Sequence, residues 1–275
     1  MRGEFASGVH ATDTLKVLNW NIERGLRLDG IIESVARERP ILCIFQEVDL
    51  DARRTGRTNI AHLLARTLGM NYVWGAEFQE LGQGDKNTPA YHGQATLTAL
   101  RIRSSRVLRF ARQSRFWAPR WFMPNWPMLQ RRLGGRMALV AEIEVGGSTM
   151  VVYNMHLESR GPETLREKQL KEVLDDVGQY PQDTAIVVAG DFNTRSHLSP
   201  LVTQLQKAGF REAVNQPLLP TSVRGRRIDW IFVRGPLRTT EGTIHHEILG
   251  SDHFPVTMVL SVDSTIVGST RGGRP

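Results

Sequence analysis

One short apolar segment, with polar residues directly after it, most limits what this chain can fold into. Residues 185–189 (AIVVA) are long enough for one buried strand, and Gly190 ends it. Asp191 and Asn193 follow, and alternate residues of an extended segment point to the same side. The carboxylate could orient or accept a proton, and the amide could hold an oxygen without adding charge. The alternative is a structural corner in which Asp and Asn serve as ordinary turn residues.

The same pattern recurs along the chain. Strands with polar residues before or after them are expected at residues 15–19, 41–45, 149–154, 228–233 and 254–260, and further strands at 72–74, 94–100 and 136–145. Helices are expected at residues 28–39, 59–68 and about 199–207, and from Pro162 and Glu163 onwards. Residues 77–92, rich in Gly and Gln, are expected to form a loop. Two sheets packed face to face with the helices outside would use every element.

Length and composition indicate one large globular domain. Its 275 residues are 40% hydrophobic and 23% charged, and no linker divides them. We expect the domain at residues 14–262, with flexible termini at 1–13 and 263–275. No apolar run reaches about 18 residues, and the start lacks the apolar core of a signal peptide, so we expect a cytoplasmic protein without membrane insertion. The lone Cys43 lies in an apolar run and is expected in the core.

The charge distribution favours an anionic partner. The formal net charge is +7 and the isoelectric point about 10.0. Residues 101–136 hold ten arginines and three tryptophans but no lysine or acidic residue, between two expected strands. Such an insertion could grip phosphates and stack on bases, lie on an anionic membrane, or cover a sheet edge with its tryptophans. The candidate substrate-binding residues in it are Trp121, Trp126, Arg131, Arg132 and Arg136.

The polar residues at the strand ends form a set suited to phosphoester chemistry. They are Asn21, Glu47, His156, Asp191, Asn193, Asp229, Asp252 and His253. Carboxylate and amide oxygens favour Mg²⁺, Mn²⁺ or Ca²⁺ over zinc, and the histidines remain for proton transfer. Adjacent strand residues point apart, so His253 needs a partner other than Asp252, and Asp229 is the candidate.

Six short motifs in a fixed order resemble the endonuclease/exonuclease/phosphatase superfamily, the DNase I-like group. They are WNI, QEV, HLES, GDFN, IDWIF and SDHFP, and the resemblance covers residues 15–260. It implies a four-layer α/β/β/α sandwich with two mostly antiparallel sheets, and metal-dependent hydrolysis of a phosphoester. By this resemblance Glu47 is the metal-binding glutamate, with Asn21 beside it, and Asp252 contacts metal or water.

The resemblance also implies the catalytic roles. Asp191 and Asn193 match the pair that positions or activates the attacking water. His253 matches the essential histidine of the superfamily, with Asp229 as the carboxylate that orients it. His156 matches a histidine found in the DNase I and sphingomyelinase branches.

One branch is more similar than the others. HLESRG, the helix after it, and Arg195 are similar to the 5′-tyrosyl-DNA phosphodiesterases, although Phe192 stands where that branch has Thr, and Thr221 and Ser222 where a Trp is expected. We therefore expect a phosphodiesterase, with Arg195 among its substrate-binding residues, that acts on nucleic acid or a nucleic-acid adduct. The alternatives are a lipid or inositol-phosphate phosphoesterase, or a nucleic-acid-binding scaffold without catalysis. The oligomeric state stays open.

Overall fold

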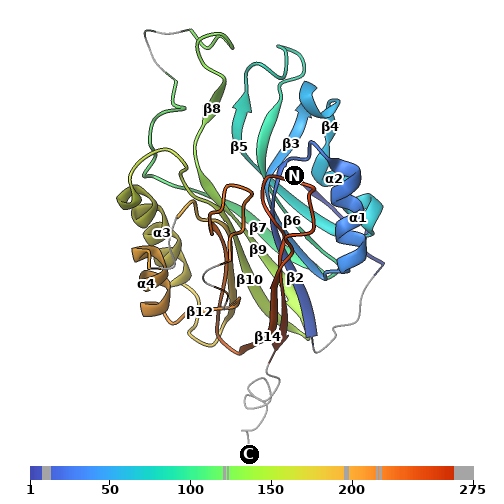
Figure 1. Ribbon diagram of the computed structural model, residues 1–275, viewed down its shortest axis with the longest axis vertical. Coiled ribbons are helices and arrows are strands. Elements are labelled where there is room, and N and C mark those ends of the chain that lie inside the picture. The colour runs from blue at the N-terminus through green and yellow to red at the C-terminus, as the bar shows by residue number, and fades with distance from the viewer. Residues whose placement is uncertain are drawn as a thin grey trace, which may run out of the picture.

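The computed structural model describes residues 1–7, 14–119, 122, 124–194, 198–214, 216 and 219–262. In this part of the chain two β-sheets pack face to face, with α3 and α4 on the outside of one and α1 and α2 on the outside of the other (Figure 1). The expected four-layer α/β/β/α sandwich is thus confirmed. Its sheets are mixed: most strand pairs are antiparallel, while β2–β3 and β10–β11 are parallel.

The first sheet contains both ends of the described chain. Its central strands are β3 (Leu42–Ala52), β2 (Thr14–Arg24) and β15 (Val256–Val262), and β14 (Leu237–Ile244) lies at one edge. On the other side follow β6 (Tyr91–Thr98), β5 (Asn71–Glu80) and β1 (Arg2–Gly3). Two short strands extend it, β4 (Thr58–Asn59) beside β3 and β8 (Arg132–Gly134) beside β5.

The second sheet holds most of the polar strand ends. Its order is β12 (Arg211–Glu212), β13 (Asp229–Arg234), β11 (Ala185–Asp191), β10 (Ser148–His156), β9 (Met137–Val145) and β7 (Ile102–Arg109). The hairpin expected at Gly146 and Gly147 joins β9 to β10, and both glycines have positive φ.

Apolar alternation along the strands produces the core between the sheets. Val17, Ile44, Val152, Val187 and Ile231 all lie in this layer and are almost fully buried. Because side chains alternate, the opposite faces of the same strands bury a second set of apolar residues against the helices. Each sheet is therefore largely apolar on both faces, and the few buried polar residues inside its central strands, such as Asn19 and Gln46, are hydrogen-bonded to one another.

The helices follow from their caps and apolar faces. On the first sheet, α1 (Leu28–Glu38) and α2 (Ile60–Leu68) pack through residues such as Ile31 and Leu64. Asn59 caps α2 by accepting a hydrogen bond from the His62 amide, at 3.0 Å. On the second sheet, α3 (Glu163–Val177) and α4 (Pro200–Lys207) cover the outer face.

Three expectations about local structure were wrong. Residues 102–109 form the edge strand β7, so the Arg-rich segment is not wholly an insertion. Most side chains of β7 are exposed, and an edge strand of this kind lacks the apolar alternation that marks a half-buried strand. The expected loop at 77–92 is shorter, because β5 runs to Glu80 and β6 begins at Tyr91.

The third difference is at the N-terminus. Residues 2–3, expected in a flexible leader, pair with β5, and the Asn71 side chain accepts hydrogen bonds from the amides of Phe5 and Ala6. Residues 8–13 and 263–275 of the expected flexible termini lie outside the described residues. Among the helices of the described chain, none has the length and apolar character needed to cross a membrane.

Candidate active site

Three expected site residues form one row across the second sheet. The strand register pairs His156 with Asp191 on β11, and Asp191 with Asp229 on β13. Directly paired residues point to the same face of a sheet, and Ala189 and Ile231, two positions further into the strands, belong to the core between the sheets. The row therefore continues the inner face of the sheet at the end of the apolar core.

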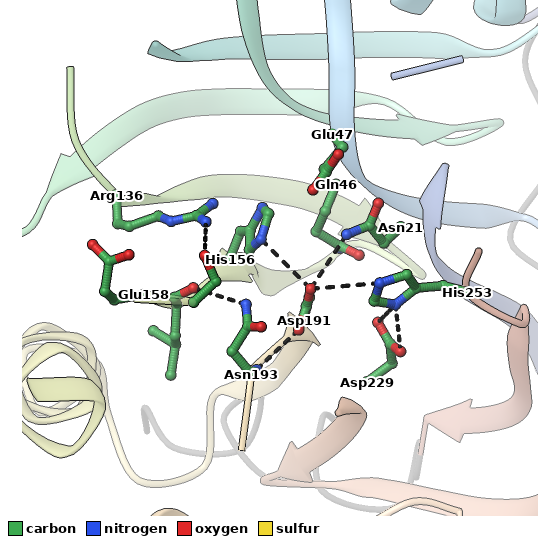
Figure 2. A network of polar contacts seen from close by, with 12 residues as sticks. Asn21, Gln46, Glu47, Arg136, His156, Glu158, Asp191, Asn193, Asp229 and His253 are labelled. Carbon is green, nitrogen blue, oxygen red and sulfur yellow. Dashed lines mark hydrogen bonds and ion pairs between the residues drawn. The ribbon is translucent and has the colours of Figure 1, made fainter. Parts of the chain in front are cut away.

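Asp191 lies at the centre of this row and is almost completely buried (Figure 2). Its Oδ1 accepts a hydrogen bond from the Asn193 amide at 2.9 Å, and its Oδ2 accepts one from Asn21 Nδ2 at 3.2 Å. Burial and the negative charge of Asp229 raise the pKa of Asp191 to about 7, against a tendency of His253 to lower it. A carboxylate with such a pKa can accept a proton at neutral pH.

His253 is fixed by Asp229, the partner expected for it. Its Nδ1 lies 2.8 Å and 3.1 Å from the two Asp229 oxygens, while its Nε2 lies 4.0 Å from Asp191 Oδ2. The Trp20 indole donates a hydrogen bond to the His253 carbonyl, at 2.8 Å, which fixes the backbone. Burial lowers the pKa of His253, but Asp229, together with the charges of Asp191 and Asp252, outweighs burial and raises the pKa to about 10. His253 is thus a buried imidazolium directed at the same carboxylate as His156.

Thr221, at the place where the resemblance predicted a tryptophan, binds the start of the strand that carries Asp229. Its hydroxyl oxygen accepts hydrogen bonds from the amides of Ile228 and Asp229, at 2.9 Å and 3.0 Å. The Thr221 hydroxyl therefore fixes the backbone at the start of β13, and this positions Asp229 beside His253.

Glu47 reaches the site because its strand is bulged. The pairing of β3 with β6 shifts register between Phe45 and Val48, and Glu47 has a φ of 53°. Gln46 points into the space between the sheets, and in a regular strand Glu47 would point to the opposite face. The bulge instead turns the Glu47 side chain towards the site. Burial raises the pKa of Glu47, but Arg24, 3.3 Å from its Oε2, and three histidines lower it well below its usual range. Glu47 is therefore an ionised, partly exposed carboxylate whose oxygens can ligate a metal cation.

Two sets of residues are candidate binding sites for a metal cation. Asp191, Asp229 and His253 offer ligand atoms within 4.8 Å of one another. However, Asp229 occupies Nδ1 of His253 and keeps the ring protonated, and an imidazolium cannot ligate a metal. The ionised Glu47, with the Asn21 amide on the neighbouring strand, is the better match for a hard divalent cation.

His156 belongs to a cluster that the sequence did not reveal. Its Nδ1 lies 3.6 Å from Glu77 Oε2, and Glu77 Oε1 accepts a hydrogen bond from Arg136 Nη1 at 3.0 Å. Arg136 also donates to the Ser159 hydroxyl. Burial and then Arg136 lower the pKa of His156 well below its ordinary value, so the ring is neutral, with Nε2 3.5 Å from Asp191 Oδ2. Glu77 went unnoticed because its segment was expected to be a loop.

Asn193 adopts a geometry that differs from the expected one. The strand ends at Asp191, and Asn193 has a left-handed φ of 51° instead of continuing the alternation. Its backbone amide binds Asp191, and its side-chain amide donates to the Leu157 carbonyl at 3.1 Å. A tight turn, not strand periodicity, brings the two residues together.

A layer of buried amides supports the site from behind. Gln46 Nε2 donates to Asn19 Oδ1 at 3.0 Å and to Asn154 Oδ1 at 2.9 Å. Asn154 in turn donates to the carbonyls of Phe45 and Ala95. These hydrogen bonds join the two sheets directly. They fix the backbone beneath the site residues that lie between Asn21 and His156.

The remaining candidates occupy different environments. Asp252 is partly buried and 3.5 Å from the Ser251 hydroxyl. Arg136 lies inside the site, the Arg132 guanidinium lies over the rings of Phe78 and Trp117, and Arg131 and Trp126 are exposed. Arg195 and Trp121 lie outside the described residues.

Comparison with known proteins relates this geometry to solved structures. The sequence model of the Endonuclease/Exonuclease/phosphatase family matches residues 18–253, whereas no curated protein matches the sequence. The fold is similar to the human Nocturnin catalytic domain with bound sulfate, at a TM-score of 0.69 and 19% identity over 92% of this chain and 96% of that one.

Two structures of one further protein share the fold. Humanized D. rerio TDP2 has a TM-score of 0.66 and 19% identity over 91% of this chain and 100% of that one. D. rerio TDP2 complexed with a single-strand DNA product has a TM-score of 0.66 and 17% identity over the same shares.

Proposed function

Because the chain belongs to the endonuclease/exonuclease/phosphatase family, we propose that it is a divalent-metal-dependent phosphodiesterase that hydrolyses nucleic acid or a nucleic-acid adduct. The observation that carries this proposal is the arrangement around Asp191. A carboxylate with a pKa of about 7 lies between a neutral His156 and a protonated His253, with an ionised Glu47 nearby. This set contains a base, a proton donor and a metal ligand.

Asp191 and Asn193 act on the attacking water. Asp191 is the group whose pKa matches neutral pH, so it accepts the proton as the water oxygen approaches phosphorus. The Asn193 turn fixes the carboxylate through its backbone amide. Because Asn21 also binds Asp191 Oδ2, the carboxylate cannot rotate freely, and its geometry is set before the substrate arrives.

His253 stabilises the charge that develops on the phosphoryl group. As an imidazolium it offers Nε2 as a charged donor, while Asp229 holds the ring through Nδ1. His156 offers a neutral ring on the opposite side of Asp191, with its Nδ1 3.6 Å from Glu77, the carboxylate that Arg136 binds. The two histidines come from β10 and from the segment before β15, and both approach one carboxylate oxygen (Figure 2).

A divalent cation completes this chemistry. Glu47 and Asn21 would hold it, with Asp252 as a further candidate ligand, and Mg²⁺ is the first choice, with Mn²⁺ or Ca²⁺ as alternatives. When bound, it supplies positive charge that polarises the phosphoryl oxygens. The partial exposure of Glu47 leaves room for water and phosphate oxygens at its other positions.

Charge and surface favour a nucleic-acid substrate. The net charge of +7 attracts polyanions, and the exposed Trp126 and Arg131 can stack on bases and contact phosphates. The DNA product bound to D. rerio TDP2 supports this choice by analogy of fold alone. A lipid phosphodiester is the second candidate, because Phe122, Trp126 and Met128 expose apolar surface in the same segment.

The test is one panel of substrates and metals. It contains single- and double-stranded DNA, RNA, 5′-tyrosyl DNA, sphingomyelin vesicles and bis(p-nitrophenyl) phosphate, each with Mg²⁺, Mn²⁺ or Ca²⁺. We expect metal-dependent cleavage of at least one nucleic acid and of the aryl phosphodiester. Cleavage of sphingomyelin without cleavage of any nucleic acid would transfer the proposal to the lipid class, and no cleavage in any arm would refute it.

A further inference from the structure

A pocket lined by four arginines adjoins the site at Glu47. The pocket holds about 420 Å³, and its arginines are Arg24, Arg54, Arg131 and Arg132. Arg24 ends β2, Arg54 lies in the short helix η1 (Arg53–Thr55), and Arg131 and Arg132 come from β8 and the residue before it. These segments line one pocket, and its Arg131 and Arg132 come from the part of the chain where β8 runs beside β5 (Figure 1).

The acidic residues near the pocket are already engaged. Glu80 pairs with Arg54 at 3.1 Å and with Arg132 at 2.8 Å. Asp49 is buried behind the pocket and accepts two hydrogen bonds from Arg54, at 2.6 Å and 2.8 Å. Arg131 is exposed and has no carboxylate partner among the described residues. Its positive charge is therefore left for a ligand.

Arg132 gives a second indication of an anion. Its Nε is buried and has no hydrogen-bond acceptor in the described chain. Burial lowers the pKa of Arg132, and the neighbouring cations Arg136 and Arg24 act in the same direction, although Glu80 opposes them. A cluster of cations with an unused donor gains most from an oxyanion such as phosphate, which guanidinium groups bind with charge-assisted hydrogen bonds.

The pocket is joined to the site by Arg24. One guanidinium nitrogen of Arg24 lies 3.3 Å from Glu47 Oε2, and the same side chain lines the pocket. A substrate whose reacting phosphate lies at Glu47 and Asp191 would therefore direct an adjacent phosphate towards the arginines. A choline-type lipid headgroup carries a cation, not a second phosphate, next to its phosphodiester, and the arginines would repel that cation.

We propose that this pocket is a second phosphate subsite, which selects substrates that carry another phosphate next to the scissile one, such as a polynucleotide or a phosphorylated nucleotide end. The proposal rests on the function proposed above. It deepens that function, because it excludes isolated phosphodiesters as preferred substrates. Specificity then comes from Arg131 and Arg132 rather than from the catalytic residues.

Binding of small nucleotides tests the subsite without turnover. Calorimetry would compare thymidine 3′,5′-bisphosphate with thymidine 5′-monophosphate on the full chain, and the bisphosphate should bind at least about tenfold more tightly. Arg131→Gln should remove most of that tenfold preference, because it deletes an exposed charge-assisted contact. Arg101→Gln is the matched control, since Arg101 is exposed at the opposite end of β9, near Glu144.

Arg132→Lys provides the second variant, because it keeps the charge but loses the planar donor set. It should also weaken the bisphosphate selectively. Equal affinity for the two nucleotides in the parent protein, or equal weakening by Arg101→Gln, would overturn the subsite. If the bisphosphate preference holds while the substrate panel shows no cleavage, the proposed function fails and the subsite stands; if cleavage occurs without the preference, the reverse is true.

Discussion

Replacing Asp229 by Asn should move the whole pH profile of the enzyme to lower pH. Asp229 is the largest influence that raises the pKa of His253, and its charge also raises the pKa of Asp191. The rise of the His253 pKa from 6.5 to about 10 corresponds to a preference of about 5 kcal/mol for the imidazolium. In Asp229→Asn this preference is mostly lost, because burial, which favours the neutral ring, remains.

The direction of each limb follows from the role of each group. Catalysis needs ionised Asp191 and protonated His253, so parent activity should rise through pH 7 and stay high up to about 9.5. In Asp229→Asn the acid limb should move below pH 7, and the alkaline limb should fall from near pH 7 upwards by about tenfold per pH unit. The stability of the folded protein should fall at alkaline pH as well. The stabilising contribution of protonated His253 is complete below pH 6.5 and is lost as pH rises through about 10.

The assay is kcat/KM for bis(p-nitrophenyl) phosphate from pH 5.5 to 9.5 at constant ionic strength and saturating Mn²⁺. Glu247→Gln is the matched control, since Glu247 is an exposed carboxylate 3.1 Å from His245 Nδ1. Its profile should follow that of the parent. An Asp229→Asn profile that is lower but unshifted would refute the electrostatic reasoning and leave Asp229 a purely structural role.

Three further results are expected. His253→Ala should cost more activity than His156→Ala, within the range of about 10²–10⁴-fold for each, and the reverse order would contradict their roles. Glu47→Gln should lower activity by at least about a hundredfold, and it should remove the rise in melting temperature that Mg²⁺ gives the parent; an unchanged rise would exclude Glu47 as a ligand. Trp126→Ala and Arg131→Gln should weaken cleavage of long DNA more than cleavage of the aryl phosphodiester. Arg131→Gln should also lower, by about 1, the slope of the logarithm of the DNA-binding constant against the logarithm of the salt concentration. Equal losses on both substrates would show a structural role.

The sequence was sufficient where local pattern and position coincide. The apolar runs that become β11 and β13 are buried on both faces and short, so their ends, and with them Asp191 and Asp229, were visible. The strand β7 was missed because its exposed side chains carry no apolar period. Six ordered motifs located the site, although none of them contains Glu77.

Long-range pairing could not be read from the chain. The contact of Glu77 with His156 and Arg136 joins β5 to β10 and to the residue before β9, and no spacing in the sequence encodes it. Likewise, the position of Glu47 depends on a bulge, and that of Asn193 on a left-handed turn, where regular alternation gives the wrong side. Residue types were thus predictable, but their orientations were set by tertiary structure.

Cleavage in ¹⁸O-labelled water tests the central claim most directly. A single-stranded DNA oligonucleotide would be incubated with the parent protein and Mg²⁺ or Mn²⁺, and its product phosphates analysed by mass spectrometry, with Asp191→Asn alongside. We expect one ¹⁸O atom in each newly formed phosphate of the parent reaction, because water attacks phosphorus, and at least about a hundredfold less product with Asp191→Asn. Products without ¹⁸O, or undiminished cleavage by Asp191→Asn, would contradict hydrolysis at this centre.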